Sequence, residues 1–273
     1  MIELPESYVL AEQIEYTLVG KTIVSAIANA NHHAFAWYTG DPMMYGAKLS
    51  GKMVARTNID NDSCGSCVEI VCDDMLLSIS TPIKYHAPGE KLPKSHQLLL
   101  KFNDESHMSC TVQMWGNMRC FLLEEKEDEM QVPSPLADSF NDAYFDNLLS
   151  GVKQSLSAKA FLATEQRIPG LGNGVLQDIL FNARIHPKSK LNTLSDEDKE
   201  QMFHSVKHTL KEMKECGGRD TEKDLFNHNG RYRTILSKNT LLQPCYVCGG
   251  VLTRKAFLGG NIYFCAQCQP LKG

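Results

Sequence analysis

Four cysteines near the C-terminus constrain the fold more than any other feature. They form two C-x2-C pairs separated by sixteen residues: Cys245 and Cys248, then Cys265 and Cys268. Each pair can place two thiolates on one tetrahedral ion at about 2.3 Å. The residues between the pairs predict two short strands around Gly259 and Gly260, a hairpin that brings the pairs together. We expect one structural Zn²⁺ with no open coordination position, with disulfides or free thiols as the alternatives.

The remaining cysteines and the N-terminus predict a reducing compartment. The chain has ten cysteines, and its first residues lack the basic stretch, apolar run and cleavage site of a signal peptide. The sequence contains no run of eighteen or more apolar residues, so it predicts no membrane span. We therefore expect a cytoplasmic protein, associated with the nucleoid in a prokaryote, whose cysteines are thiols or metal ligands. Cys64 and Cys67 form another C-x2-C pair without a matching pair nearby, so we expect core or loop cysteines there.

Charge is distributed unevenly along the chain. The net charge is −4, yet residues 231–273 contain six Lys or Arg and no Asp or Glu. This segment therefore carries +6 and leaves −10 on the rest of the chain. A basic module on an acidic body remains compatible with a polyanionic partner, because the distribution of charge matters more than its sum.

The first 123 residues predict a β-sandwich with one N-terminal helix. The opening stretch MIELPES alone is compatible with an ordinary first strand, whereas residues 10–20 have helical spacing and end at a glycine. Beyond these, β-branched or alternating runs are separated by Gly, Asp, Asn and Pro. The predicted strands are 21–30, 52–59, 66–72, 75–81, 96–102 and 108–115. Residues 124–135, a charge run followed by two prolines, predict a linker.

Residues 136–230 predict a helical domain, followed by the zinc module at 231–273. The longest predicted helix follows Ser195, a plausible N-cap, and stops at Gly217 and Gly218. Between two earlier helices lies a Gly-Leu-Gly-Asn turn that ends at Gly172 and Asn173. This turn has three interpretations: a tight helix–helix connection, a dinucleotide fingerprint weakened by the absence of a preceding strand, or a helix N-terminus that binds a DNA phosphate.

Three motifs in order resemble the Fpg/Nei family of DNA glycosylases. They are an N-terminal E-L-P-E, the Gly-Leu-Gly-Asn turn followed by Ile-His-Pro, and the C-terminal C-x2-C pairs with Tyr-Phe before the third cysteine. The resemblance covers nearly the whole chain. It implies an α+β multi-domain protein: a catalytic β-sandwich with a flanking helix, a helix–two-turns–helix domain, and a zinc-finger β-hairpin. It also implies a partner, double-stranded DNA with damaged or abasic sites, and we expect a monomer.

The resemblance assigns roles to several residues. Glu3 matches the family's catalytic carboxylate, and Glu6 matches its second N-terminal acid. Asn173 matches the phosphate-binding asparagine, and Lys159 matches a lysine that also grips the DNA backbone. Arg119 falls near residues that fill the gap left by a flipped base. The expected DNA-binding residues are Lys159, Gly172, Asn173, Arg254, Asn261 and Arg119.

Three positions depart from the family pattern. The family nucleophile is an N-terminal proline, but Ile2 occupies that position, and Met1 should be retained before so large a residue. The family's hairpin arginine falls at Gly260, beside Asn261. A first-domain lysine has no match, and Arg56 is the only nearby base.

The chemistry that remains is a carboxylate without its amine. A Schiff-base mechanism needs an amine nucleophile, whereas a monofunctional glycosylase can use a carboxylate to activate water. The first hypothesis is therefore a DNA glycosylase, with weak or no lyase activity, acting on a flipped damaged or modified base. The alternative is a pseudoenzyme that binds DNA lesions or structures. A zinc-ribbon protein with an RNA or protein partner is the third.

Overall fold

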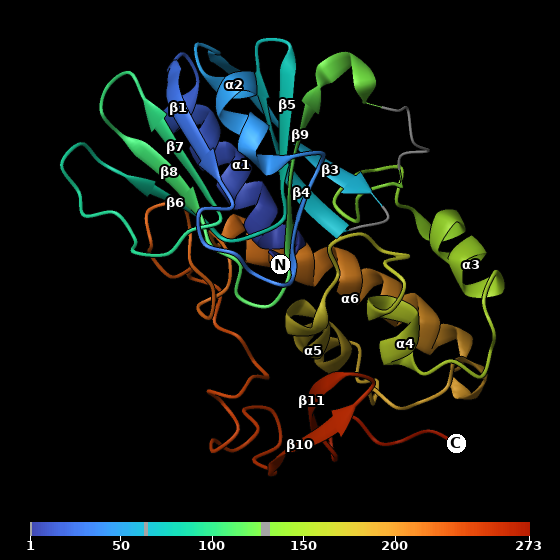
Figure 1. Ribbon diagram of the computed structural model, residues 1–273. Helices are drawn as coiled ribbons and strands as arrows, with labels where there is room; N and C mark the ends of the chain where they lie inside the picture. The colour runs from blue at the N-terminus through green and yellow to red at the C-terminus, as the bar shows by residue number, and fades with distance from the viewer. Residues whose placement is uncertain (1, 63–64, 127–131) are drawn as a thin grey trace. The chain divides into compact units, whose positions relative to one another are not determined.

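The computed structural model describes residues 2–62, 65–126 and 132–273, which form two compact units (Figure 1). Unit 1 comprises residues 2–62, 66–126 and 221–230, and unit 2 comprises residues 132–220 and 231–273. Cys64 and part of the expected linker lie outside the described residues. None of the helices in the described part of the chain is both long and apolar enough to cross a membrane.

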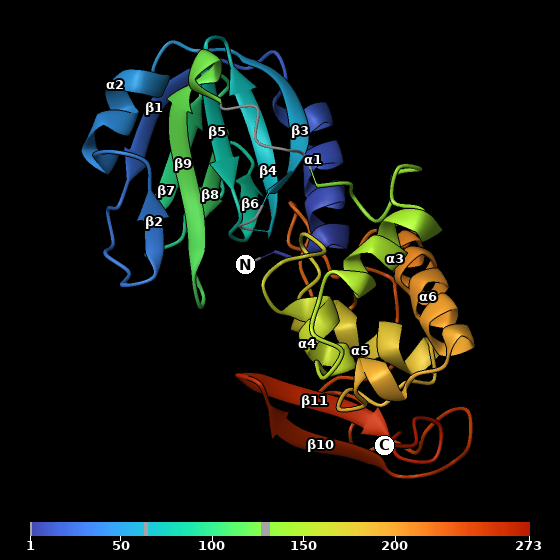
Figure 2. The same ribbon diagram turned by 90° about the vertical axis from the view of Figure 1, so that its right-hand side faces the viewer.

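Unit 1 contains two β-sheets and a long N-terminal helix that share one hydrophobic core (Figures 1 and 2). One sheet has the order β1-β7-β8-β6 and is antiparallel, and the other has the order β2-β9-β5-β4-β3, with β2 parallel to β9. Their elements are α1 (Leu4–Leu18), β1 (Ile23–Ala28), β2 (Ala36–Tyr38), a 3₁₀ turn (Pro42–Met44), α2 (Tyr45–Leu49), β3 (Val54–Asp62), β4 (Gly65–Cys72), β5 (Met75–Ile79), β6 (Ile83–His86), β7 (Leu98–Phe102), β8 (His107–Cys110), β9 (Gly116–Leu122) and a 3₁₀ turn (Leu123–Glu125). The predicted sandwich with a flanking helix is confirmed.

The start of the chain is helical, so the strand that MIELPES alone allowed is wrong. Helix α1 begins at Leu4, and Pro5 lies in its first turn. Proline is favoured there because its missing N–H would have no partner in the helix anyway. Leu4, Leu10 and Ile14 are fully buried, and the helix packs alongside β3 (Figure 2). The helix thus extends six residues N-terminal to the predicted one, which began at residue 10.

The predicted strand 108–115 is also corrected. Strand β8 ends at Cys110, residues 111–115 form a loop, and β9 begins at Gly116. A Cβ at Gly116 would lie 2.2 Å from the Thr81 side chain, so no larger residue fits where β9 starts. The loop therefore brings Trp115 to the start of β9, next to the edge strand β2.

Residues 221–230 pack with unit 1. Leu225 is fully buried in the core of this unit, and its carbonyl accepts the backbone N–H of Tyr85 at 2.8 Å. Gln13 of α1 binds both Asp224 and the Leu225 N–H. These contacts attach the segment to α1 and β6.

Unit 2 contains four helices and a two-stranded hairpin packed against α5 (Figure 2). The elements are α3 (Asp142–Ser150), α4 (Ala158–Ala163), α5 (Asn173–Asn182), a 3₁₀ turn (Leu191–Thr193), α6 (Asp196–Glu215), β10 (Leu252–Phe257) and β11 (Gly260–Cys265). The expected cap at Ser195 is confirmed: Ser195 and Asp198 form a capping box, and α6 ends just before Gly217 and Gly218, both with positive φ. The predicted hairpin is confirmed as well.

Candidate functional site

The backbone nitrogen of Ile2 is an amide held in a hydrogen bond. It donates to the Ser80 carbonyl at 2.9 Å, and the Ile2 side chain is 8% exposed within the core of unit 1. An amide nitrogen in the chain has no basic lone pair, so it cannot replace the amine of a terminal proline. The dry surroundings of this side chain are those of a structural residue.

The two acidic residues that follow occupy different environments. Glu3 is the N-cap of α1 and is half-buried, and its carbonyl accepts the Ser7 N–H at 3.0 Å. The helix N-terminus favours a negative charge at this point. Glu6 lies in the first turn and is only 5% exposed. Unit 1 thus presents one accessible carboxylate at the start of α1, with a buried one behind it.

The basic residues predicted in unit 1 lie on strands. Arg119 is in the middle of β9, in register with Ser78 of β5, and its Nη2 donates to Ser78 Oγ at 3.3 Å. Arg56 is exposed on β3. A half-buried arginine within a sheet has less freedom than one in a loop, and a role for Arg119 in filling a DNA gap stays a prediction.

The four finger cysteines converge on one point. Their Sγ atoms all lie within 4.8 Å of one another, and none of the four forms a disulfide. The Sγ atoms of Cys245 and Cys268 are 3.8 Å apart, and those of Cys248 and Cys265 are 3.4 Å apart. Tetrahedral Zn²⁺ with sulfur at about 2.3 Å requires sulfurs separated by about 3.8 Å. This donor set therefore fits a metal ion that prefers thiolates.

A polar cluster joins the finger hairpin to the starts of α4 and α5, and it contains the predicted phosphate ligands. Lys159 Nζ donates to the Phe257 carbonyl at 2.7 Å, and Asn173 Nδ2 donates to the Asn261 carbonyl at 2.9 Å. Gln177 Nε2 also donates to the Asn261 carbonyl, and Gln177 Oε1 accepts the Tyr263 N–H. Burial lowers the pKa of Lys159, whose side chain is 3% exposed. In this arrangement both predicted phosphate ligands bind hairpin carbonyls.

Gly260 faces the same cluster. A Cβ built at Gly260 would lie 3.5 Å from both Lys159 Nζ and the Asn173 amide, an ordinary contact distance. A longer side chain at this position would therefore extend beside the two predicted phosphate ligands, where the family resemblance expects an arginine. The hairpin's own exposed arginine is Arg254, whose Nε donates to Asn261 Oδ1 at 3.0 Å.

Asp178 is a buried anchor that we did not predict from the sequence. It lies in α5 and is fully buried, and its two oxygens accept the backbone N–H groups of Ile235 and Leu236 at 2.9 and 2.8 Å. Burial raises the pKa of Asp178 to about 6, although these hydrogen bonds oppose the rise. Asp178 therefore holds the chain that leads into the finger, at the cost of a buried charge near neutral pH.

This pKa predicts an unusual pH dependence for unit 2. Because the folded pKa lies above the unfolded value, the stabilisation is complete at low pH and is lost as the pH rises towards 6 and beyond. Between about pH 5 and pH 7.5 the loss should be about 1.4 kcal/mol. We expect Asp178→Asn, which cannot ionise, to destabilise the protein more at the lower pH than at the higher one. Urea unfolding of both proteins at each pH measures this difference, and an equal effect at both would contradict it.

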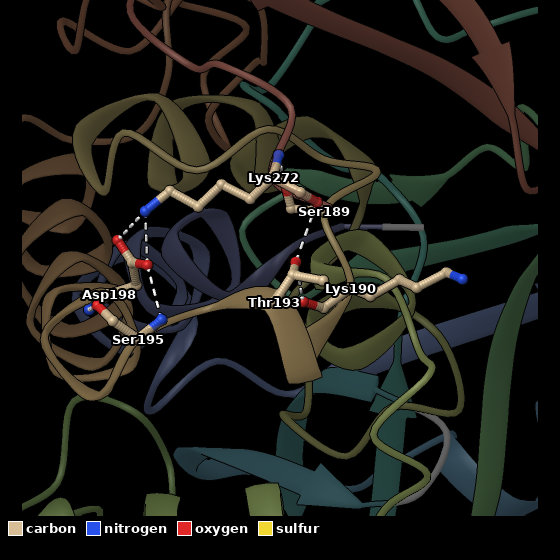
Figure 3. A network of polar contacts seen from close by, with 6 residues as sticks. All are labelled: Ser189, Lys190, Thr193, Ser195, Asp198 and Lys272. Carbon is tan, nitrogen blue, oxygen red and sulfur yellow. Dashed lines mark hydrogen bonds and ion pairs between the residues drawn. The ribbon is translucent and has the colours of Figure 1, made fainter.

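The segment after the fourth cysteine is bound to the start of α6 (Figure 3). Lys272 Nζ lies 2.6 and 2.7 Å from the two oxygens of Asp198, and its backbone N–H donates to Ser189 Oγ. Thr193 Oγ1 donates to the Lys272 carbonyl at 3.0 Å. Burial opposes ionisation of Asp198, but the Lys272 ammonium and the Ser195 N–H outweigh it and lower the pKa. This clasp ties the finger to the helical part of unit 2.

Comparisons with known proteins agree with this arrangement. The family model of the formamidopyrimidine-DNA glycosylase H2TH domain matches residues 132–224. The formamidopyrimidine-DNA glycosylase of Bacillus subtilis is 30% identical over 169 residues, 59% of this chain and 60% of that protein. The matched stretch thus spans less than two thirds of that relative. The Bacillus cereus protein of the same name is 23% identical over 99% of both chains.

Solved structures show the same fold over the whole length. The Lactococcus lactis Fpg in complex with DNA containing an abasic site has a TM-score of 0.82 at 21% identity, covering 98% of this chain and 99% of that one. Its complex with DNA containing N7-benzyl-Fapy-dG gives 0.83 at 22% identity, with the same coverage. Residues 132–224 thus match the H2TH domain of formamidopyrimidine-DNA glycosylases, and the chain as a whole is similar to the Fpg/Nei family of DNA glycosylases.

Proposed function

We propose that this protein is a repair glycosylase that releases a damaged or modified base from DNA and leaves the abasic strand largely uncut. The observation that carries the proposal is the pairing of a half-buried carboxylate, Glu3, with an Ile2 nitrogen committed to an amide hydrogen bond. Support for the DNA substrate comes from the relatives, whose names specify formamidopyrimidine-DNA glycosylase. The titles of the similar structures name DNA with abasic or damaged sites.

Glu3 supplies the chemistry in this proposal. A carboxylate at the N-terminus of α1 would activate water for attack on an oxocarbenium-like sugar, as glycoside hydrolases do. Glu6 is buried behind it, which favours a positioning role over contact with the sugar. The test is base release from single-stranded and duplex oligonucleotides that each carry one lesion, with strands analysed before and after alkali. Cleavage only after alkali is expected.

The same Ile2 hydrogen bond supports a second candidate function, that of a lesion-binding protein without catalytic activity. A dry apolar residue next to Glu3 leaves less room for water than the family's proline would. The two candidates differ in one result. Tight binding to lesion-containing DNA with no base release from any lesion, even after alkali, would favour the binding protein.

The proposal includes one structural Zn²⁺ bound in the finger. When bound, it would hold the finger hairpin in shape and take no part in the reaction, since four thiolates fill a tetrahedral ion. The four cysteines would hold it, and the hairpin would then present Arg254 and Asn261 to DNA. Lys159 and Asn173 would anchor that hairpin and offer their other donors to a phosphate, since a lysine ammonium has three N–H bonds.

Salt dependence separates phosphate contacts from anchoring contacts. Arg254→Met should reduce the slope of log K against log salt by about 0.9, because one phosphate contact is lost. Lys159→Met should reduce the slope by the same amount, because its ammonium is proposed to contact a phosphate as well. Asn173→Ala should weaken binding to damaged and undamaged DNA equally. Fluorescence anisotropy titrations over a range of salt concentrations give the slopes.

Two further variants serve as controls for this measurement. Lys211→Met removes an equal charge from an exposed position on α6 and should leave the slope unchanged. Gly260→Arg adds a cation beside Lys159 and Asn173, and should increase the slope by about the same 0.9. A slope unaffected by Arg254→Met, or selective loss of damaged-DNA binding in Asn173→Ala, would show that these residues do not bind phosphates.

A further inference from the structure

A row of aromatic side chains lines one edge of unit 1. His33 and Phe35 lie in the turn that leads into β2, the edge strand of the five-stranded sheet (Figure 2), where the Ala36 N–H donates to the His33 carbonyl at 3.0 Å. Trp37 lies on β2 itself, and Trp115 lies in the loop before β9. Successive ring centroids are 6.2, 6.5 and 5.9 Å apart. These four rings form what we call the aromatic row.

The row is open to solvent. Phe35 is 55% exposed and Trp37 is 47% exposed, and Met114 beside Trp115 is 74% exposed. Both tryptophans of the chain belong to the row. Exposed apolar side chains gathered in one place mark an interaction surface, whereas isolated ones need no explanation.

Hydrogen bonds connect the aromatic row to the N-terminal site within the same unit. The Gly116 N–H donates to the Phe35 carbonyl at 3.0 Å, and the Ser80 N–H donates to the Asn117 carbonyl at 3.0 Å. The Ser80 carbonyl in turn accepts the Ile2 N–H. A short chain of backbone hydrogen bonds therefore links the end of the row at Trp115 to Ile2, the residue before Glu3.

The charges around the row suit an anionic partner. The two stretches that carry it, residues 30–40 and 111–119, contain no Asp or Glu, although the first 230 residues are acidic overall. They do contain one cationic side chain, that of Arg119. Aromatic side chains without neighbouring carboxylates are the pattern with which proteins stack nucleobases beside a phosphate backbone.

We propose that the aromatic row is a stacking platform for unpaired bases, so that the substrate of the neighbouring site is single-stranded DNA or an unpaired region of a duplex. The inference rests on the proposed function, because it places these bases next to Glu3. Paired bases present only their edges, while unpaired bases expose the flat faces that Phe and Trp contact. Stacking of this kind tolerates any sequence.

Tryptophan fluorescence tests the platform directly, because the only tryptophans are in the row. Titration with an oligothymidylate should quench the emission, in parallel with binding followed by anisotropy. The double variant Phe35→Ala, Trp37→Ala should lose about 10-fold in affinity for the oligonucleotide for each ring removed. Tyr16→Ala, which removes a 90% exposed aromatic residue on α1, is the matched control and should bind as the unmodified protein does.

Phe35→Leu keeps the apolar bulk but removes the ring, so it replaces the double variant in this experiment if that variant does not fold. Its affinity for the oligonucleotide should also fall several-fold. Unchanged emission at saturation, or unchanged affinity in both variants, would overturn the platform. Base release from a paired duplex without quenching by single strands would reject the platform and leave the proposed function standing. Quenching without base release from any substrate would reject the function instead.

Discussion

Cys265→Ser should release the metal ion and unfold the finger, the largest effect expected of any single substitution here. Four Sγ atoms within 4.8 Å of one another form a closed thiolate site. Three of these cysteines also pack with Phe181, Leu236 and Leu252 in a small hydrophobic cluster, so loss of the metal exposes apolar surface as well. Zinc contributes about 10–16 kcal/mol to modules of this size, far more than a cluster of six residues can replace.

Loss of the finger should also reduce DNA affinity. All six charged side chains in residues 231–273 are Lys or Arg. Losing several phosphate contacts lowers the affinity for DNA by about 10²–10³-fold at moderate salt. Metal analysis should find one zinc per chain, and almost none in the variant. Cys216→Ser, outside the cluster, is the control and should keep both metal and affinity.

The tryptophans provide an internal check on this prediction. Trp37 and Trp115 both lie in unit 1, so their emission reports the fold of that unit independently of the finger. We expect an unchanged tryptophan spectrum in Cys265→Ser together with rapid proteolysis within residues 245–268. Full metal content or unchanged DNA affinity in this variant would contradict the assignment of a structural zinc.

The second large effect concerns the reaction at the N-terminus. With Met1 retained, borohydride should trap little or no covalent adduct with abasic DNA, because the free amine lies one residue, about 3.3–3.6 Å, from the family position. Nucleophilic attack requires the reacting atoms to lie about 3–3.5 Å apart. A shift of this size therefore moves the amine out of attack distance of the sugar carbon. Glu3→Gln should reduce base release by at least about 100-fold while changing DNA affinity little.

Two variants sharpen this prediction. Glu12→Gln neutralises an exposed carboxylate on the same helix and should release bases at the unmodified rate. Ile2→Pro should lead to removal of Met1, expose a secondary amine at the family position, and yield a borohydride-trapped adduct. Strong trapping in the unmodified protein that survives Glu3→Gln would reveal an unrecognised amine, and full activity in Glu3→Gln would reject the carboxylate mechanism.

Local sequence patterns determined the elements whose signals are short-range. The spacing of the four cysteines predicted both the hairpin and the convergence of the thiols. Ser195 and the glycine pair at 217–218 predicted the limits of α6. In each case the decisive interactions, metal-ligand spacing and helix capping, occur between residues close in sequence, so the sequence displays them directly.

The first residues and the β8–β9 region show where local patterns failed. MIELPES alone is compatible with a short strand, but Pro5 suits a helix start and Leu4 is buried in the core. The apolar run 108–115 continues past the true end of β8, because the chain must leave the sheet to bring Gly116 against Thr81. Burial against distant residues decided both outcomes.

Only the tertiary structure decided the contacts that give the sites their chemistry. The Ile2 N–H meets Ser80, Lys159 reaches the Phe257 carbonyl 98 residues away, and Asp178 binds amides more than 50 residues further along the chain. The aromatic row likewise joins residues 33–37 to Trp115. No spacing rule encodes such pairs, because hydrogen bonds and ring contacts form wherever the folded chain brings groups together. The sequence by itself therefore determined which groups this protein possesses, and the fold decided which of them are buried, paired or open to DNA.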